Sequence, residues 1–193
     1  MIDLFDLGGC NKAPSAINPS KLIWLNKHYL KSLDAAHVAR HLSWHMGQLG
    51  IDPIDGPHLT DVVKAFAERS DTLKDMAQAA IFLYREFEDY DGKAADKNLT
   101  TAAEEPLRYL REALGALVEW RAGPIHDVVK TVAVKGDLAL GKVAQPLRVA
   151  VSGTAVSPPI DVTLELLGRS KSLWRIERAL RHIRRSADGE RLK

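Results

Sequence analysis

The chain has 193 residues and a mass of 21.3 kDa, with 46% hydrophobic and 27% charged residues. This composition is typical of folded globular proteins and excludes a disordered tail or a fibrous repeat. The sequence contains neither an apolar run long enough to span a membrane nor a secretory signal. The single cysteine, Cys10, excludes an internal disulfide and a multi-thiolate metal cage. We therefore expect a cytoplasmic protein with no membrane partner.

Charge is unevenly distributed along the chain, although the formal net charge is only +2. Residues 1–140 contain 16 Lys and Arg against 20 Asp and Glu, whereas residues 141–193 contain 11 against 5. A basic C-terminal region favours a polyanionic partner. Basic terminal helices are also often simply solvated, so composition alone leaves both interpretations open.

Apolar residues recur with helical spacing along nearly the whole chain, which predicts an all-α protein. In the first half, Asn18 before Pro19 indicates one helix start and Asp34 indicates another, because short polar side chains cap free amide groups. The helices predicted in this half span residues 19–33, 35–49, 57–66 and 72–84.

The charged, glycine-containing segment 85–98 breaks the helical periodicity. We predict a loop there, as the boundary between two helical subdomains, residues 1–90 and 91–193. A capping box, Thr101 with Glu104, predicts the start of the helix that follows. The helices predicted in this half span residues 101–120, 123–135, 142–151 and 157–167, with a last helix after Gly168.

The last helix combines an apolar stripe with a basic face. The predicted buried stripe consists of Leu173, Ile176, Leu180 and Ile183, and the predicted solvent-facing cations are Arg175, Arg178, Arg181, Arg184 and Arg185. Such a face suits binding to phosphates.

Signatures of catalysis are absent from the sequence, including glycine-rich phosphate loops and the zinc-protease motif. One cluster invites a metal interpretation, because His37, His41 and His45 are spaced to lie on one helical face. A metal site normally needs further ligands from another element, and none is evident. We therefore expect no catalytic residue and no metal, and keep a small metal-dependent helical enzyme as an alternative.

A basic pocket is indicated near the start of the helix predicted at 157. Ser157 is a natural N-cap, Pro158 suits the first helical position, and Arg148 lies one helix earlier. Free amides at a helix start and an arginine fork together suit phosphates or base edges. The alternative is that Ser157 merely caps and Arg148 only bridges helix ends.

At these residues the sequence resembles the C-terminal anticodon-binding region of bacterial glutamyl-tRNA synthetases. The resemblance continues in the family's order from about residue 4 to 182. The stretches that carry it are Phe5-Asp6-Leu7 with Asn11-Lys12, Lys21 to Tyr29, Glu68 to Leu73, Gln145 to Pro158, and Leu166 to Leu180.

The resemblance implies a stem-contacting helical subdomain over residues 1–90 and an anticodon-binding helical cage over residues 91–193. The family's catalytic signatures, His-x-Gly-His and a Lys-Met-Ser-Lys-Ser-like loop, do not occur here. The chain thus resembles the C-terminal part of such an enzyme, starting after the second signature. We expect it to be inactive alone and to carry no cofactor; ATP and Mg are implied only for the full-length enzyme, which attaches glutamate to its tRNA.

The family's base-reading residues are matched here by Arg69, Arg148, Ser157, Pro158 and Ile160. By resemblance, Arg148 reads the middle anticodon base, uracil, and Arg69 favours cytosine at the third position. The segment Ser157 to Ile160 receives the first and middle bases, largely through backbone groups. Pro159 replaces a frequent glycine, which puts any contact by that backbone amide in doubt because proline has no N–H.

The basic residues Arg175, Arg178 and Arg181 of the last helix are expected to hold backbone phosphates, so that affinity falls with salt. The expected partner is glutamate tRNA, bound by a monomer, with no DNA partner. The remaining alternative is an all-helical protein-interaction module without RNA specificity, in which amphipathic helices dock a partner helix.

Overall fold

The computed structural model describes residues 18–191, which form ten α-helices, two short 3₁₀ helices and, within that range, no strand. The prediction of an all-α protein is confirmed. The helices are α1 (Pro19–Ser32), α2 (Ala35–Gln48), η3 (Pro53–Asp55), α3 (Leu59–Phe66), η4 (Ala67–Arg69), α4 (Leu73–Tyr84), α5 (Gly92–Asn98), α6 (Thr101–Gly115), α7 (Ala122–Lys135), α8 (Leu140–Ser152), α9 (Ile160–Leu167) and α10 (Arg169–Arg191).

Side-chain caps fix the starts of the early helices. Asn18 accepts a hydrogen bond from the Lys21 amide at 3.3 Å. Asp34 accepts from the amides of Ala36 and His37, both at 3.0 Å. These bonds satisfy amides that have no partner inside the helix, as the sequence predicted.

The predicted loop over residues 85–98 is partly wrong, because its second half forms α5. The Asp91 carboxylate accepts from the Ala94 amide at 2.8 Å, and this cap starts a helix despite its glycine at the first position. The predicted capping box is also wrong. Thr101 already lies within α6, Thr100 occupies the cap position without a side-chain bond, and the helix ends at Gly115.

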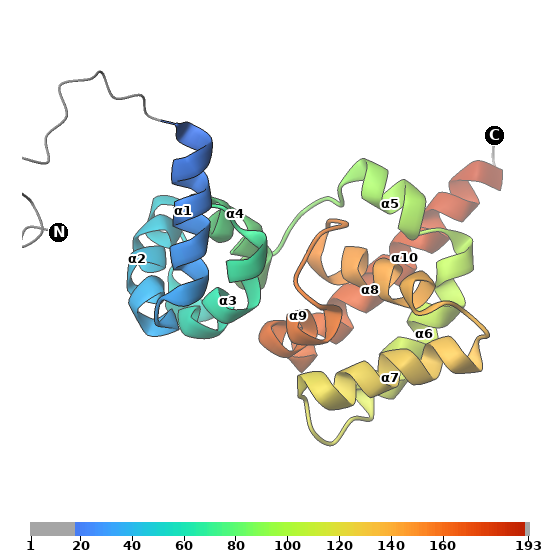
Figure 1. Cartoon of the computed structure of the whole chain (residues 1–193). Helices are drawn as coiled ribbons and strands as arrows, with labels where there is room; N and C mark the ends of the chain where they lie inside the picture. Colours follow the sequence, from blue (N-terminus) through green and yellow to red (C-terminus); the bar gives the residue numbers. More distant parts are fainter. Residues whose placement is uncertain (1–17, 192–193) are drawn as a thin grey trace, which may run out of the picture.

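The helix α8 forms the centre of the C-terminal half. It packs against α5, α6, α7, α9 and α10, which surround it in Figure 1. The side chains of Val143, Leu147, Val149, Ala150 and Val151 are completely shielded from solvent. Burial of side chains of this size stabilises the fold by about 1.5–3 kcal/mol each.

The helices α1 to α4 lie together on one side of the molecule, and α5 to α10 lie on the other (Figure 1). The helix α3 packs against α9 across the two groups, and the buried residues form one continuous core cluster. A division into two subdomains at about residue 90 therefore stays a prediction.

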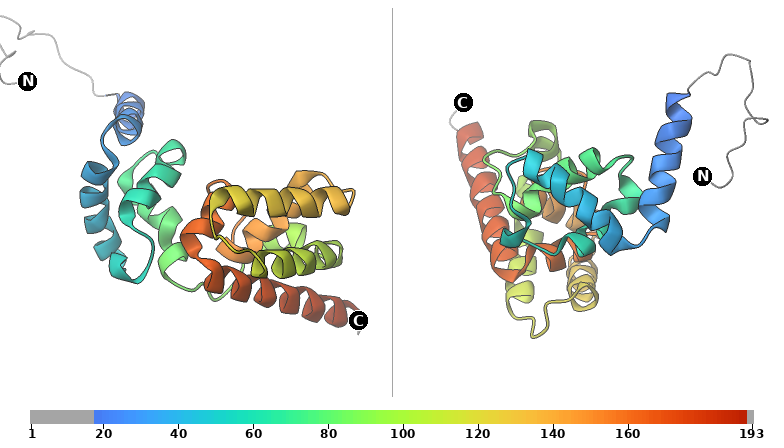
Figure 2. Two further views of the ribbon diagram at one scale, coloured as in Figure 1. Left: turned by 90° about the horizontal axis from the view of Figure 1, so that it is seen from below. Right: turned by 90° about the vertical axis from the view of Figure 1, so that its left-hand side faces the viewer.

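The helix α1 lies at the edge of the molecule and buries little of its surface (Figure 2). Several large apolar side chains of this helix and its C-terminal end are exposed: Leu22, Leu25, Tyr29 and Leu33 are 55%, 39%, 50% and 45% accessible. In this helix only Leu30 is buried. Across the described part of the chain, no helix has the length and apolar character needed to cross a membrane.

The last helix buries most of its predicted stripe, since Ile176, Leu180 and Ile183 are in the core. Its basic face differs from the prediction at Arg175, which is 0% exposed although it was expected to face solvent. Helical spacing places Arg175 next to Ile176 at the edge of the stripe, and polar partners in the interior make its burial possible.

Four protein groups satisfy the buried Arg175 guanidinium. Its Nε and Nη2 bind the two carboxylate oxygens of Glu86 at 3.0 and 3.1 Å. Its Nη2 also donates to the Phe82 carbonyl at 2.8 Å and, at 3.4 Å, to that of Arg85. Its Nη1 donates to the Val151 carbonyl at 2.5 Å. Arg175 therefore joins α10 to the ends of α4 and α8.

We expect Arg175→Met to lower the free energy of unfolding by about 2–4 kcal/mol, because the variant leaves buried carbonyls without donors. Urea denaturation measured by circular dichroism checks this. The control is Arg181→Met on the exposed face of the same helix, which should change stability by less than about 0.5 kcal/mol. Equal effects of the two substitutions would contradict the interior role of Arg175.

Candidate nucleic-acid interface

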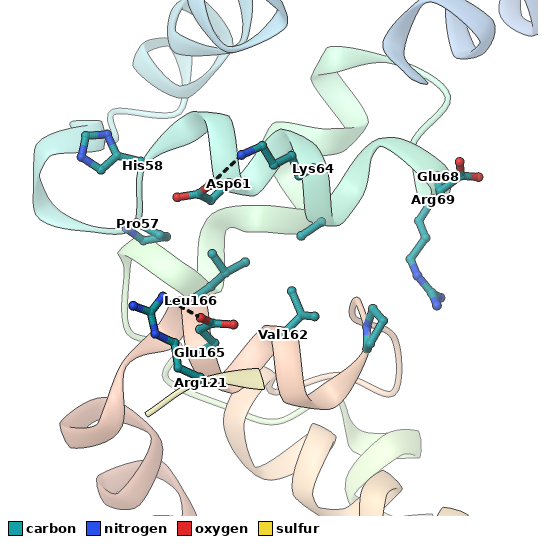
Figure 3. A pocket seen from close by; sticks show the side chains of 12 residues that line it. Pro57, His58, Asp61, Lys64, Glu68, Arg69, Arg121, Val162, Glu165 and Leu166 are labelled. Atoms are coloured by element: carbon teal, nitrogen blue, oxygen red, sulfur yellow. Dashed lines mark hydrogen bonds and ion pairs between the residues drawn. The ribbon is translucent and has the colours of Figure 1, made fainter. Parts of the chain in front are cut away.

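A cleft of about 760 Å³ separates the α3–η4 segment from α9. One wall carries Pro57, His58, Lys64 and Arg69, and Pro159 with Leu166 lies on the other side. Figure 3 shows the Arg69 side chain extending from its wall toward the facing one. Both walls of the cleft come from one chain.

Most charged groups of the cleft are paired with each other. Lys64 lies 3.4 Å from the Asp61 carboxylate, and Arg121 lies 3.7 Å from Glu165. Arg69 is exposed and, within residues 18–191, has no carboxylate partner. Arg69 is thus the cleft cation available to an incoming ligand.

Arg148 lies beside the cleft on α8 and is held at two of its three nitrogens. Its Nε donates to the Ser157 hydroxyl at 3.0 Å, and its Nη1 donates to the Gln145 side-chain oxygen. Partial burial lowers the pKa of the Arg148 guanidinium, and the positive charge of Arg69 lowers it further. The structure therefore brings together the two arginines that the sequence predicted as base readers.

The segment from Ser157 to Ile160 differs from the predicted helix start. The helix α9 begins at Ile160 with Pro159 at the cap position, and Ser157 does not cap it. Instead Ser157 accepts from Arg148, because the two consecutive prolines keep the chain extended before the helix. The side chains of Ser157, Pro158 and Ile160 are buried, so any ligand contact there falls to backbone groups.

The three arginines predicted to bind phosphates lie in different environments. The phosphate role of Arg175 does not fit its complete burial. Arg178 donates to the Phe87 carbonyl at 2.7 Å, and its guanidinium carbon lies 4.0 Å from the centre of the Phe87 ring. Its guanidinium is therefore engaged mainly in contacts within the protein. Arg181 is exposed on α10 and remains accessible to a ligand.

The histidines of α2 do not form a metal site. The rings of His37 and His41 meet edge to face with their centres 5.0 Å apart, and the His45 ring meets the Trp44 ring edge to face instead. Among the described residues, no group of three or more His, Cys, Asp or Glu side chains could hold an ion. The alternative of a metal-dependent enzyme built on these histidines therefore has no structural support.

Two features of the interface were not predicted. Arg121 and His58 line the cleft from turns, which carry no periodic or motif signal in the sequence. Gln145 lies within the stretch that resembles the synthetases, but its contact with Arg148 became evident only from the structure. Its spacing of three residues before Arg148 on a helix was the available signal.

Tyr84 supports the rim of the cleft. Its hydroxyl donates to the Pro57 carbonyl at 2.7 Å, and burial raises its pKa to about 12. A side chain at Gly56 would meet the Tyr84 ring at 2.4 Å, so the glycine allows this close approach. The bond ties the η3–α3 turn to α4.

A helical fold with an exposed arginine in a cleft and a basic C-terminal end is compatible with the class of nucleic-acid-binding proteins. The family described as the anticodon binding domain matches residues 35–180, and the chain belongs to that family.

Two curated relatives are named glutamate–tRNA ligase 1. The protein of Nitrosococcus oceani is 50% identical over 183 residues, which is 95% of this chain and 39% of the relative. The protein of Alkalilimnicola ehrlichii is 49% identical over 189 residues, 98% of this chain and 40% of the relative. The chain thus spans about two fifths of the length of these relatives.

Solved structures show the same fold. A glutamate tRNA ligase from Elizabethkingia meningosepticum matches with a TM-score of 0.81 and 23% identity, over 93% of this chain and 35% of that one. A glutamate–tRNA synthetase from Elizabethkingia anophelis matches with a TM-score of 0.75 and 23% identity, over 92% and 34%.

We expect the stability of the chain to fall as the pH rises from about 10 to 12, partly through Tyr84. Below pH 10 the residue is protonated in both states; above it the unfolded chain loses this proton first, because the folded pKa is higher. Tyr84→Phe should lower the free energy of unfolding by about 1 kcal/mol near neutral pH and should reduce the loss of stability at alkaline pH.

Urea midpoints measured between pH 8 and 11 check the expectation. The control is Tyr109→Phe, since the Tyr109 side chain is 46% exposed. An alkaline slope that is the same in the unaltered chain and in Tyr84→Phe would contradict the role of this hydroxyl.

Proposed function

We propose that this chain recognises the anticodon loop of glutamate tRNA. The observation that carries the proposal is the placement of Arg148. Ser157 and Gln145 hold its side chain by hydrogen bonds, and the positive charge of Arg69 lies close enough to lower its pKa. Two neighbouring cations with donors open to solvent suit the acceptor-rich edges of unstacked bases. The family membership and the names of the relatives support the same function.

Three parts of the interface would contact the anticodon bases. Arg148 would read the middle base, uracil, and Arg69 would favour cytosine at the third position. The backbone of Ser157, Pro158 and Ile160 would receive the first and middle bases. Pro159 supplies no amide, so the contacts of this segment would use the amides after it and the carbonyls around it.

Phosphate contacts would come from the exposed part of α10. Arg181 and Arg185 are both exposed and lie one helical turn apart, which suits them to the RNA backbone. Arg175 and Arg178 would act indirectly, by holding α10 against the segment that follows α4. Such charge contacts make affinity fall with salt.

In a full-length ligase, anticodon recognition would be coupled to ATP- and Mg-dependent attachment of glutamate in the cytoplasm. The catalytic signatures for that reaction do not occur in this sequence, and no step of it is assigned to these residues. Because one chain provides both walls of the cleft, we propose that it binds tRNA as a monomer.

The alternative of a protein-interaction module without RNA specificity is not favoured. It would leave the matched anticodon binding domain and the paired arginines unexplained. It predicts binding that is independent of the anticodon sequence and little affected by salt.

We expect Arg148→Ala to weaken binding of a glutamate anticodon stem-loop by about 10–30-fold, because a charged donor to the middle base is lost. The unaltered chain should bind in the micromolar range, about −8 kcal/mol, with affinity that falls between two salt concentrations. Fluorescence anisotropy with a labelled stem-loop measures both effects.

The control for this test is Arg108→Ala, an exposed arginine of α6 that should change affinity less than about twofold. A stem-loop changed at the middle uracil tests specificity. Equal binding of the two loops by the unaltered chain would exclude anticodon recognition and leave only a nonspecific basic surface.

We expect Arg69→Gln to reduce the preference for cytosine over guanine at the third position by about tenfold. Arginine donors match the acceptor edge of cytosine, whereas guanine presents donors there. Competition titrations with the two stem-loops measure the ratio. The neighbouring substitution Glu68→Gln is the control, and an unchanged ratio in Arg69→Gln would show that the assignment is wrong.

A further inference from the structure

Gln145 is placed to control the orientation of the base-reading arginine. It precedes Arg148 by three residues on α8, so both side chains lie on the same face of the helix. The Gln145 oxygen accepts from Nη1 of Arg148, while Nε is bound to Ser157 at 3.0 Å. Within the described residues Nη2 has no hydrogen-bond partner, so one end of the guanidinium stays open.

The serine on the other side of Arg148 is itself fixed. Ser157 is 5% exposed, and its hydroxyl donates its single proton to the Pro158 carbonyl at 2.9 Å. The oxygen is then left to accept, from Arg148 and from the buried Thr163 hydroxyl at 3.2 Å. The guanidinium is therefore held from both sides, by a serine oxygen that is fixed in its own network and by the Gln145 oxygen.

Fixing the guanidinium matters because uracil and cytosine differ in the direction of their hydrogen bonds. Uracil presents a carbonyl oxygen where cytosine presents an amino donor, and cytosine offers its acceptors elsewhere on the same edge. An arginine free to rotate can follow the acceptors of either base. An arginine held in one orientation donates well only to a base whose acceptor lies in front of its open nitrogen.

We propose that Gln145 is a positioning residue that gives Arg148 its selectivity for uracil over cytosine at the middle anticodon position. The proposal rests on the proposed function. Gln145 itself need not touch the RNA, because its effect passes through the orientation of Arg148. Loss of its oxygen should therefore reduce discrimination more than affinity.

The test compares Gln145→Leu with Gln145→Glu, which keeps an acceptor oxygen, and with the exposed control Gln78→Leu. Each protein is titrated with anticodon stem-loops that carry uracil or cytosine at the middle position. We expect Gln145→Leu to reduce the uracil-to-cytosine affinity ratio about fivefold, chiefly by raising the affinity for the stem-loop that carries cytosine. Gln145→Glu and Gln78→Leu should keep the ratio.

A second measurement uses the free protein and needs no RNA. Nitrogen-15 NMR of arginine side chains reports rotation about the Nε–Cζ bond of Arg148. Rotation should be slow in the unaltered chain and in Gln145→Glu, and fast in Gln145→Leu. Equal rotation rates in all of them would overturn the positioning role.

The outcomes separate this proposal from the proposed function. If Gln145→Leu leaves the uracil-to-cytosine affinity ratio unchanged, or lowers the affinity for both loops equally, the positioning role is overturned while anticodon recognition stands. If the unaltered chain does not distinguish uracil from cytosine, the proposed function fails and this proposal fails with it. In that case the NMR result still shows whether Gln145 holds the arginine.

Discussion

The architecture depends on a single buried cation, Arg175, and on the acceptors that surround it. A guanidinium is costly to remove from water, so it stays in the interior only where carbonyls and a carboxylate replace its hydration. Here these groups come from the end of α4, the following segment and the end of α8. The requirement to satisfy one side chain of α10 thus brings together residues 82–86 and Val151, which are far apart in sequence.

Most helix boundaries could be predicted because they depend on local chemistry. The caps at Asn18 and Asp34 act within four residues, and the sequence contains all the groups involved. Some errors are local, such as the missed cap at Asp91, and others arise where a partner from another element competes. Ser157 was expected to cap a helix but binds Arg148 from another element, and Arg175 was expected in solvent but is buried against Glu86. Periodicity does not reveal such partners.

The candidate site was predicted in its composition but not in its geometry. The resemblance to the synthetases identified Arg69 and Arg148, which the structure places near each other. No spacing in the sequence relates residue 69 to residue 148, because their proximity follows from the packing of α3 on α9. The role of Gln145 likewise needs the side-chain contacts.

Arg69 and Arg148 are carried by different groups of helices, one beside α3 and one on α8. Under the proposed roles, substitutions on the α3 side would change the third-base preference while leaving the hydrogen bonds of Arg148 with Ser157 and Gln145 in place. If the proposed roles apply, a change in one wall of the cleft would alter which of two related anticodons the protein prefers. The arrangement would let specificity at the middle and third anticodon positions change largely independently.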